Sequence, residues 1–238
     1  MGEIRVRTGI ETLDDLIGGG FIKGRSYLIA GEPGTGKTTF SLQYVLNGAK
    51  LGEPGIYITI DEKPEHLISD ADSMGWPLKE YLDRGTLQIL DVSSYFSATR
   101  LGKVGKIEVE RIIDDLGGYV KKLGAKRLVI DPIAPLITRT EAVSEIQEYI
   151  RKLIFGIEES TECTTLFTSN IPVGTLKLSQ YGIEEFIVSG ILLLKLVKPE
   201  KKYIRTLFVR KMRGTQTELS EYSFDIVKER GIVLRSPV

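Results

Sequence analysis

The chain has 238 residues, 42% of them hydrophobic and 27% charged, a composition typical of globular proteins. Lysine plus arginine and aspartate plus glutamate both number 32, so the formal net charge is +0. This balance excludes a strong overall field for polyanions, so nucleic-acid binding would require a local basic patch. The length fits one large α/β domain, and we predict a single domain over residues 1–238.

The opening residues and the cysteine content bear on where the protein resides. The first residues lack the apolar core of a signal peptide, and no apolar run is long enough to span a bilayer. Cys163 is the one cysteine, so an internal disulfide is excluded, which suits a reducing compartment. We therefore expect a cytoplasmic protein with no membrane partner, in which Cys163 is a structural thiol.

Apolar runs alternate with stretches of helical spacing through the first two thirds of the chain. Strands are predicted at Ser26–Ala30, Ile56–Ile60, Leu87–Leu90, Arg127–Ile130 and Thr164–Thr168. Helices are predicted over Phe40–Ala49, from Pro64 to Gly75, over Ile107–Leu123 and over Ser144–Ser160, and residues 93–106 are predicted to form a surface loop. Because the crossovers run to about a dozen residues or more, the sheet should be mostly parallel and doubly wound, with helices on both faces.

The C-terminal part of the chain has a different pattern. Four strand-like runs follow one another with short connections, at Ile187–Val197, Tyr203–Arg210, Tyr222–Val227 and Ile232–Leu234. Short connections are typical of antiparallel pairs, so we expect antiparallel strands that extend the sheet.

A glycine-rich motif follows the first predicted strand and precedes the first long helix. Its residues, Gly31-Glu32-Pro33-Gly34-Thr35-Gly36-Lys37-Thr38, match the phosphate-binding pattern G-x-x-x-x-G-K-[ST]. Glycines let the backbone curl so that successive N–H groups point into one concavity, and the following helix adds its own free N–H groups. Lys37 supplies a charge for the outer phosphates, Thr38 a hydroxyl for Mg²⁺, and Thr39 is placed to contact the inner phosphate. The motif predicts binding of ATP or ADP with Mg²⁺.

Asp131 stands at the end of the predicted strand Arg127–Ile130. In proteins with this loop, an aspartate at the end of a later buried strand is the expected partner of Mg²⁺. The alternative is that Asp131 caps a turn before Pro132, because many strands end in aspartate.

Two further acids, Asp61 and Glu62, follow the strand after the loop's helix. Carboxylates at the carboxyl edge of a parallel sheet lie near its ligand crevice, where they can orient a water molecule for attack on the γ-phosphate. We expect Glu62 to lead, because its side chain reaches further than that of Asp61. The alternative is that the pair caps the helix that begins near Pro64.

Several segments together resemble the KaiC-like branch of the RecA superfamily along nearly the whole chain. They are the entry segment Gly9–Gly20, the strand and acids Gly55–Pro64, the pair Gly75-Trp76 followed by Leu78, the segment Tyr181–Phe186, and Lys211-Met212-Arg213-Gly214-Thr215. The combination is more specific than the phosphate-binding motif alone.

The resemblance implies a RecA-like fold and hydrolysis of ATP to ADP and phosphate with Mg²⁺. It also implies a homohexameric ring with nucleotide at the subunit interfaces, where Lys211 and Arg213 of one subunit would contact the γ-phosphate held by its neighbour. An arginine that stabilises the charge of the transferring phosphoryl group suits that chemistry. Without the resemblance, the two residues would be interpreted as a basic edge strand or turn.

This sequence departs from the family pattern at three places. The first of the paired acids is usually glutamate, and here it is Asp61. A histidine often follows the segment that ends at Thr215, and here Gln216 and Thr217 stand there. Where the second domain of the clock protein carries phosphorylated hydroxyl residues, this chain has Glu185 and Phe186, so the resemblance implies neither autophosphorylation at that place nor a circadian role.

Other features leave alternatives open. Ser169-Asn170 either senses the γ-phosphate or forms a turn. The basic cluster Lys198, Lys201, Lys202 and Arg205 is a solvated hairpin or a nucleic-acid patch, and His66 is interpreted as a surface residue. Alternatives to the hydrolase are a nucleic-acid-dependent recombinase or helicase-like ATPase, a kinase built on the same loop, and a nucleotide-switched scaffold with little turnover.

Overall fold

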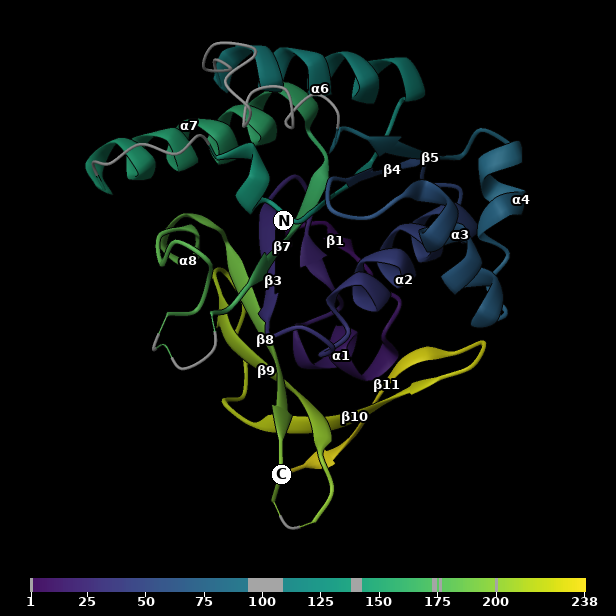
Figure 1. The fold of residues 1–238 in the computed structure, drawn as a ribbon, viewed down its shortest axis with the longest axis vertical. Helices are drawn as coiled ribbons and strands as arrows, with labels where there is room; N and C mark the ends of the chain where they lie inside the picture. The colour runs from purple at the N-terminus through teal and green to yellow at the C-terminus, as the bar shows by residue number, and fades with distance from the viewer. Residues whose placement is uncertain (1, 94–108, 138–142, 173–174, 176, 200) are drawn as a thin grey trace.

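A nine-stranded sheet organises the molecule (Figure 1). The computed structural model describes residues 2–93, 109–137, 143–172, 175, 177–199 and 201–238. Within these residues the strand order is β11-β10-β9-β8-β3-β7-β6-β4-β5. The bounds are β3 (Ser26–Gly31), β4 (Gly55–Thr59), β5 (Leu87–Asp91), β6 (Arg127–Asp131), β7 (Thr164–Asn170), β8 (Gly190–Val197), β9 (Ile204–Met212), β10 (Glu221–Val227) and β11 (Gly231–Pro237).

The strands from β8 to β5 in that order are all parallel, and β9, β10 and β11 extend the sheet antiparallel. The predicted mostly parallel sheet with antiparallel C-terminal strands is confirmed. The predicted strand Ile187–Val197 begins three residues later, at Gly190, as β8. It pairs antiparallel to β9 on one side, as expected, and parallel to β3 on the other, so β8 joins the two parts of the sheet.

Helices cover both faces of the sheet (Figure 1). One face carries α2 (Lys37–Lys50), α3 (Pro64–Ser73) and α4 (Leu78–Asp83), and the other carries α6 (Val109–Leu123) and α7 (Val143–Thr161). The strand residues alternate accordingly: Tyr27 and Ile29 of β3 pack with the first group, and Leu28 and Ala30 with the second. This two-sided burial is why β3 is apolar at each position from Tyr27 to Ala30 instead of at every second one.

The N-terminal segment forms a small layer of its own. Strands β1 (Arg5–Val6) and β2 (Phe21–Ile22) pair antiparallel, and α1 (Glu11–Leu16) lies between them in the sequence. Short elements also occur at Ala134–Leu136, a turn of 3₁₀ helix, and at Glu184–Ile187, which is α8. Most of the predicted loop 93–106, from residue 94 on, lies outside the described residues. Within the described parts of the chain, every helix is too short or too polar to cross a membrane.

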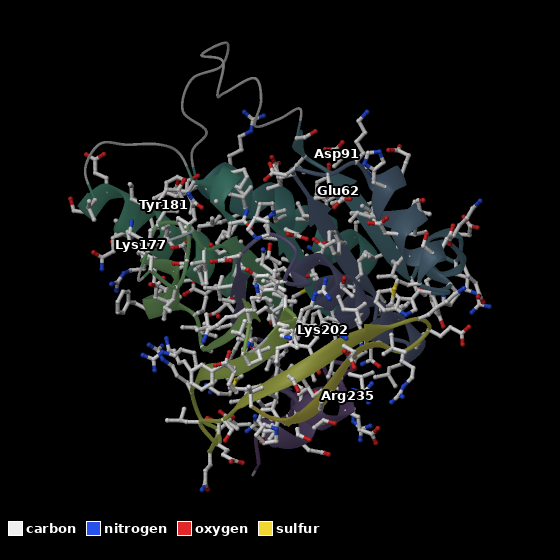
Figure 2. All side chains as sticks on the ribbon, turned by 60° about the horizontal axis from the view of Figure 1, so that its bottom comes forward. Glu62, Asp91, Lys177, Tyr181, Lys202 and Arg235 are labelled. Atoms are coloured by element: carbon white, nitrogen blue, oxygen red, sulfur yellow. The ribbon has the colours of Figure 1, made fainter. Side chains whose placement is uncertain are left out.

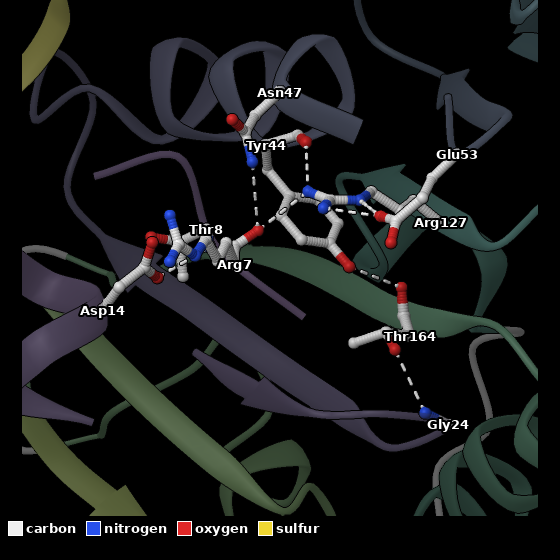
Figure 3. Close-up of polar contacts among 9 residues, drawn as sticks. All are labelled: Arg7, Thr8, Asp14, Gly24, Tyr44, Asn47, Glu53, Arg127 and Thr164. Carbon is white, nitrogen blue, oxygen red and sulfur yellow. Dashed lines mark hydrogen bonds and ion pairs between the residues drawn. The ribbon is translucent and has the colours of Figure 1, made fainter. Parts of the chain in front are cut away.

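A buried arginine at the start of β6 joins the N-terminal segment to the sheet (Figure 3). The Arg127 side chain is 0% exposed, and its Nη1 donates to the carbonyl oxygens of Arg7 and Tyr44, both at 2.8 Å. Its Nε donates to Glu53 Oε2 at 2.8 Å, and the guanidinium lies 4.7 Å from the centre of the Tyr44 ring. A Cβ at Gly48 would lie 2.4 Å from Arg127, so this helical position is glycine because the arginine occupies its space.

We expect Arg127→Met to lower the free energy of unfolding by about 2 kcal/mol, because the buried carbonyls of Arg7 and Tyr44 lose a donor. Glu53→Gln should cost less than about 1 kcal/mol, because the Glu53 side chain is 37% exposed and exposed ion pairs contribute little. Urea unfolding followed by the fluorescence of Trp76, the one tryptophan, measures both. Equal losses in the two variants would show that the ion pair, and not the bonds to the carbonyls, stabilises the fold.

Candidate functional site

The carboxyl ends of the central parallel strands surround a cavity of about 750 Å³. The phosphate loop, residues Gly31–Thr38, follows β3; Asp61 and Glu62 follow β4; Asp131 ends β6 and Asn170 ends β7. The residues that line the cavity are Pro33, Gly34, Gly36, Lys37, Thr38, Thr39, Thr59, Asp61, Glu62, Lys63, His66, Asp131, Pro132, Asn170, Arg205 and Ile226. Elements far apart in the sequence therefore contribute to one pocket, as expected where parallel strands end together.

Three positions of the phosphate loop require glycine, because a side chain there would clash with its neighbours or strain the backbone. Gly34 and Gly36 have φ angles of +80° and +104°, in the left-handed region that favours glycine. A Cβ on Gly31 would lie 2.4 Å from the Leu194 carbonyl oxygen of β8 and 2.7 Å from Thr35 Oγ1. Within the loop, the Thr35 hydroxyl donates to the Glu32 carbonyl at 2.8 Å, which stabilises its curled conformation.

The Lys37 ammonium lies within the curl of the loop. It donates to the carbonyl oxygens of Gly31 at 2.8 Å and Glu32 at 3.0 Å. Burial lowers the pKa of Lys37, and the negative charge of Asp131 opposes that shift. The ammonium is thus held against the loop carbonyls at the pocket that Lys37 lines.

Asp131 is the centre of a hydrogen-bond cluster at the floor of the pocket. Its Oδ2 accepts from Thr38 Oγ1 at 3.0 Å and from the Tyr57 hydroxyl at 2.5 Å, and its Oδ1 accepts from Thr168 Oγ1. Burial and the Asp131 charge hold the pKa of Tyr57 well above its usual range, so Tyr57 stays protonated and donates. The two predicted Mg²⁺ ligands, Thr38 and Asp131, are therefore brought into contact, and a hydroxyl next to a carboxylate is an oxygen donor set that suits Mg²⁺.

The paired acids Asp61 and Glu62 line the same pocket after β4. Thr59 donates from its hydroxyl to the Glu62 backbone carbonyl at 2.6 Å, which shapes the turn after β4. Burial raises the pKa of the Glu62 carboxyl, and the negative charges of Asp70 and Asp131 raise it further, while His66 opposes the shift. Figure 2 shows Glu62 in the same part of the view as Asp91, which ends the neighbouring strand β5. A carboxylate with a raised pKa is suited to accept a proton near neutral pH.

Seven lining residues were not assigned to the site from the sequence or were left open: Thr59, Lys63, His66, Pro132, Asn170, Arg205 and Ile226. His66 lines the cavity although it was interpreted as a surface residue only, and Asn170 faces the pocket from the end of β7. Arg205, which the sequence placed in a basic hairpin, donates from Nε to the Gly34 carbonyl at 3.1 Å. Ile226 of β10 lies beside Gly36, where an added Cβ would be 3.3 Å from Ile226 Cδ1. Predicting these neighbours requires knowledge of which strands pair, which a single sequence does not contain.

Lys211 and Arg213 lie away from this pocket. Met212 pairs with Gly190, which pairs with Tyr27, whereas Gly31 pairs with Leu194. Arg213 is therefore roughly 15 Å from the phosphate loop along the strands at about 3.3 Å per residue. Arg213 Nη2 donates to the Phe186 carbonyl at 3.1 Å, and Lys211 Nζ donates to the carbonyls of Glu185 and Val188 at 2.9 and 2.7 Å.

This fold and this pocket define a phosphate-loop protein with a RecA-like sheet. The family model described as "ATPase: KaiC" matches residues 6–237. The chain belongs to the KaiC-like ATPase family.

Known proteins similar to this chain fall into long and short forms. It is 33% identical over 223 residues to the circadian clock oscillator protein KaiC of Synechococcus elongatus, a match that covers 93% of this chain and 42% of KaiC. The chain thus spans about two fifths of the length of that clock protein. It is 33% identical to a UPF0273 protein of Pyrococcus horikoshii, with 97% of this chain and 93% of that protein covered. A crystal structure of a KaiC-like protein from Pyrococcus horikoshii matches with a TM-score of 0.83 at 36% identity, over 99% of this chain and 100% of that one.

We expect Gly31→Ala to weaken ATP binding by about tenfold or more, because a methyl group at this position must displace the β8 backbone or the loop itself. Titration with a fluorescent ATP analogue measures the affinity. Gly118→Ala is the matched control, because a Cβ there meets nothing within 4 Å; it should keep the affinity and stabilise α6 by about 0.5–1 kcal/mol. Unchanged affinity in Gly31→Ala would contradict the tight fit of the loop against β8.

Proposed function

We propose that this protein hydrolyses ATP to ADP and phosphate with Mg²⁺, at sites shared between adjacent copies in a homo-oligomeric ring. The observation that carries the proposal is the cavity in which the phosphate loop, the Thr38–Asp131 pair and Glu62 converge. The single domain over residues 1–238 and a cytoplasmic location remain predictions that accompany it.

Different groups of the protein bind the phosphates and activate the attacking water. The backbone N–H groups of the loop and Lys37 bind the phosphates and offset negative charge as it develops. Glu62 orients a water molecule and takes its proton as the oxygen attacks the γ-phosphorus, while the bond to the ADP oxygen breaks. Asp61 lines the same wall and assists by its charge.

Thr38 and Asp131 are the residues that would hold Mg²⁺. Bound there, the ion would neutralise charge on the β- and γ-phosphates. The fit is supported by the contact between the two side chains and by the hydroxyl donors of Tyr57 and Thr168, which orient the carboxylate.

The place of Lys211 and Arg213 supports a shared site. Along the strands, Arg213 is roughly 15 Å and Lys211 roughly 10 Å from their own phosphate loop, and neither side chain lines the pocket of its own subunit. Arg213 is exposed at the surface, where a neighbouring copy can receive it. We infer that each subunit offers this basic turn to the γ-phosphate held by the next subunit, which completes that site.

Complementation between variants tests the shared site. Glu62→Gln should bind ATP without turnover, and Arg213→Ala should bind ATP but hydrolyse it at least about a thousandfold more slowly, because a trans arginine contributes 10³–10⁵ in rate. Coexpressed at equal levels with different tags, the two variants should together recover up to about a quarter of wild-type activity, because each interface draws its two subunits independently. Phosphate release measured on the doubly purified complexes checks this.

Two controls keep that experiment decisive. Lys37→Ala loses ATP binding and should not rescue Glu62→Gln, because both variants damage the pocket and neither damages the trans turn. Phosphate transfer to a protein or small acceptor, measured with labelled ATP, would instead favour a kinase. Failure of Glu62→Gln and Arg213→Ala to rescue one another, with both folded and assembled, would contradict shared sites.

The pH dependence of kcat/KM provides a second test. Burial and the neighbouring Arg213 charge lower the pKa of Lys211 to about 8, so Lys211 loses its charge as the pH rises through that value. The raised pKa of Glu62 makes the base protonate, and activity fall, as the pH drops. We expect a bell-shaped profile whose alkaline limb moves to higher pH in Lys211→Arg, since arginine stays charged. An alkaline limb that does not move would remove Lys211 from the mechanism.

A further inference from the structure

The turn that carries Arg213 is held by a residue near the start of the chain. Arg5 of β1 donates from Nη1 to Thr215 Oγ1 at 2.7 Å and from Nη2 to the Gly214 carbonyl at 3.3 Å. The partners are 210 and 209 positions apart in the sequence. Arg5 therefore binds the two residues that directly follow Arg213.

The same guanidinium is also bound by the segment that follows α1. Its Nη1 also donates to the carbonyl oxygens of Ile17 at 3.0 Å and Gly20 at 3.1 Å. Carbonyls at the end of a helix lack intrahelical donors and carry partial negative charge, so a guanidinium is well suited to them. Because the fork of arginine is planar and rigid, Arg5 holds the two turns in a defined relation.

Packing encloses the Arg213 turn against the same N-terminal layer. Gly214 has a φ of +70°, and a Cβ there would lie 3.1 Å from Ile22 Cδ1 and 3.2 Å from Glu3 Oε2. The methyl group of Thr215 lies close to Gly18, where an added Cβ would be 3.6 Å away. The turn packs directly on the β1–β2 layer. Because Arg5 belongs to that layer, its hydrogen bonds set the position of the turn relative to it.

On the other side the turn is tied to the segment after α8. The backbone N–H of Arg213 donates to the Ser189 carbonyl at 2.9 Å, and its side chain donates to the Phe186 carbonyl at 3.1 Å. Arg213 thus stands between two supports, the 186–189 segment and Arg5. Removing Arg5 leaves the 186–189 segment and the packing on the N-terminal layer, but it takes away the side-chain hydrogen bonds to residues 214 and 215.

We propose that Arg5 is a positioning residue for the trans arginine: it holds the turn 213–215 so that Arg213 reaches the neighbouring subunit's nucleotide in one defined geometry. This inference rests on the proposed shared site. Arg5 does not line the nucleotide pocket, so it acts through Arg213 and not on the bound phosphates. Preorganisation of a charged group lowers the cost of ordering it in the transition state, and a displacement of about 1 Å is enough to lose about 10²-fold in rate.

Kinetics separate positioning from a general structural role. In Arg5→Ala we expect kcat to fall about 10- to 100-fold, while the Kd for a fluorescent ATP analogue changes less than about twofold, because the pocket is untouched. Thr215→Val removes only the hydroxyl that accepts the shortest of these bonds, and it should lower kcat in the same direction. Arg84→Ala is the matched control, an arginine in an exposed ion pair with Glu80 on α4, and it should keep wild-type kcat.

Complementation then assigns the defect to the turn. Arg5→Ala coexpressed with Glu62→Gln should recover activity as Arg213→Ala does, whereas Arg5→Ala with Arg213→Ala should recover none. If Arg213→Ala is rescued by Glu62→Gln and Arg5→Ala is not, the role of Arg5 is overturned and the shared site stands. If neither is rescued, the shared site itself fails. If Arg5→Ala does not fold, unchanged kcat in Thr215→Val would overturn the proposal.

Discussion

The carboxylate of Asp131 is the constraint on which the rest of the pocket depends. It accepts hydrogen bonds from Thr38 at the start of α2, from Tyr57 in β4 and from Thr168 in β7. One half-buried carboxylate thereby ties the helix that follows the phosphate loop to two strands on the floor of the site. Because these bonds form on folding, the loop and the oxygen ligands are in place before a nucleotide binds, and little reorganisation is left for the reaction.

Strand β9 links two sites at its opposite ends. Arg205, near the start of β9, contacts the phosphate loop of its own subunit at Gly34, and Arg213 follows directly after the end of β9. An extended strand is stiff, so the two arginines are held at a fixed separation, one in contact with the phosphate loop and the other exposed at the surface. In a ring of such subunits, each sheet would span from one nucleotide to the next, and turnover would depend on assembly.

The N-terminal segment stabilises both ends of this arrangement. The Arg7 carbonyl accepts from the buried Arg127 at the base of β6, and the Arg5 side chain binds the turn at 214–215. This segment buries apolar side chains in the core, among them Leu13, Ile17 and Phe21, and two guanidinium groups also hold it by hydrogen bonds to backbone carbonyls. Such bonds are directional, so they add a defined geometry to the apolar packing.

The sequence by itself determined the phosphate loop, the strands and helices around it and the order of the acids, because local spacing encodes them: glycines at fixed offsets, β-branched runs that end in Asp61–Glu62 and Asp131, and helical periodicity. It did not determine that β8 runs parallel to β3, that Arg205 and His66 line the pocket, or that Arg5 meets Gly214 and Thr215. Those contacts join positions far apart in the chain. They follow from strand pairing and packing, which only the tertiary structure decides.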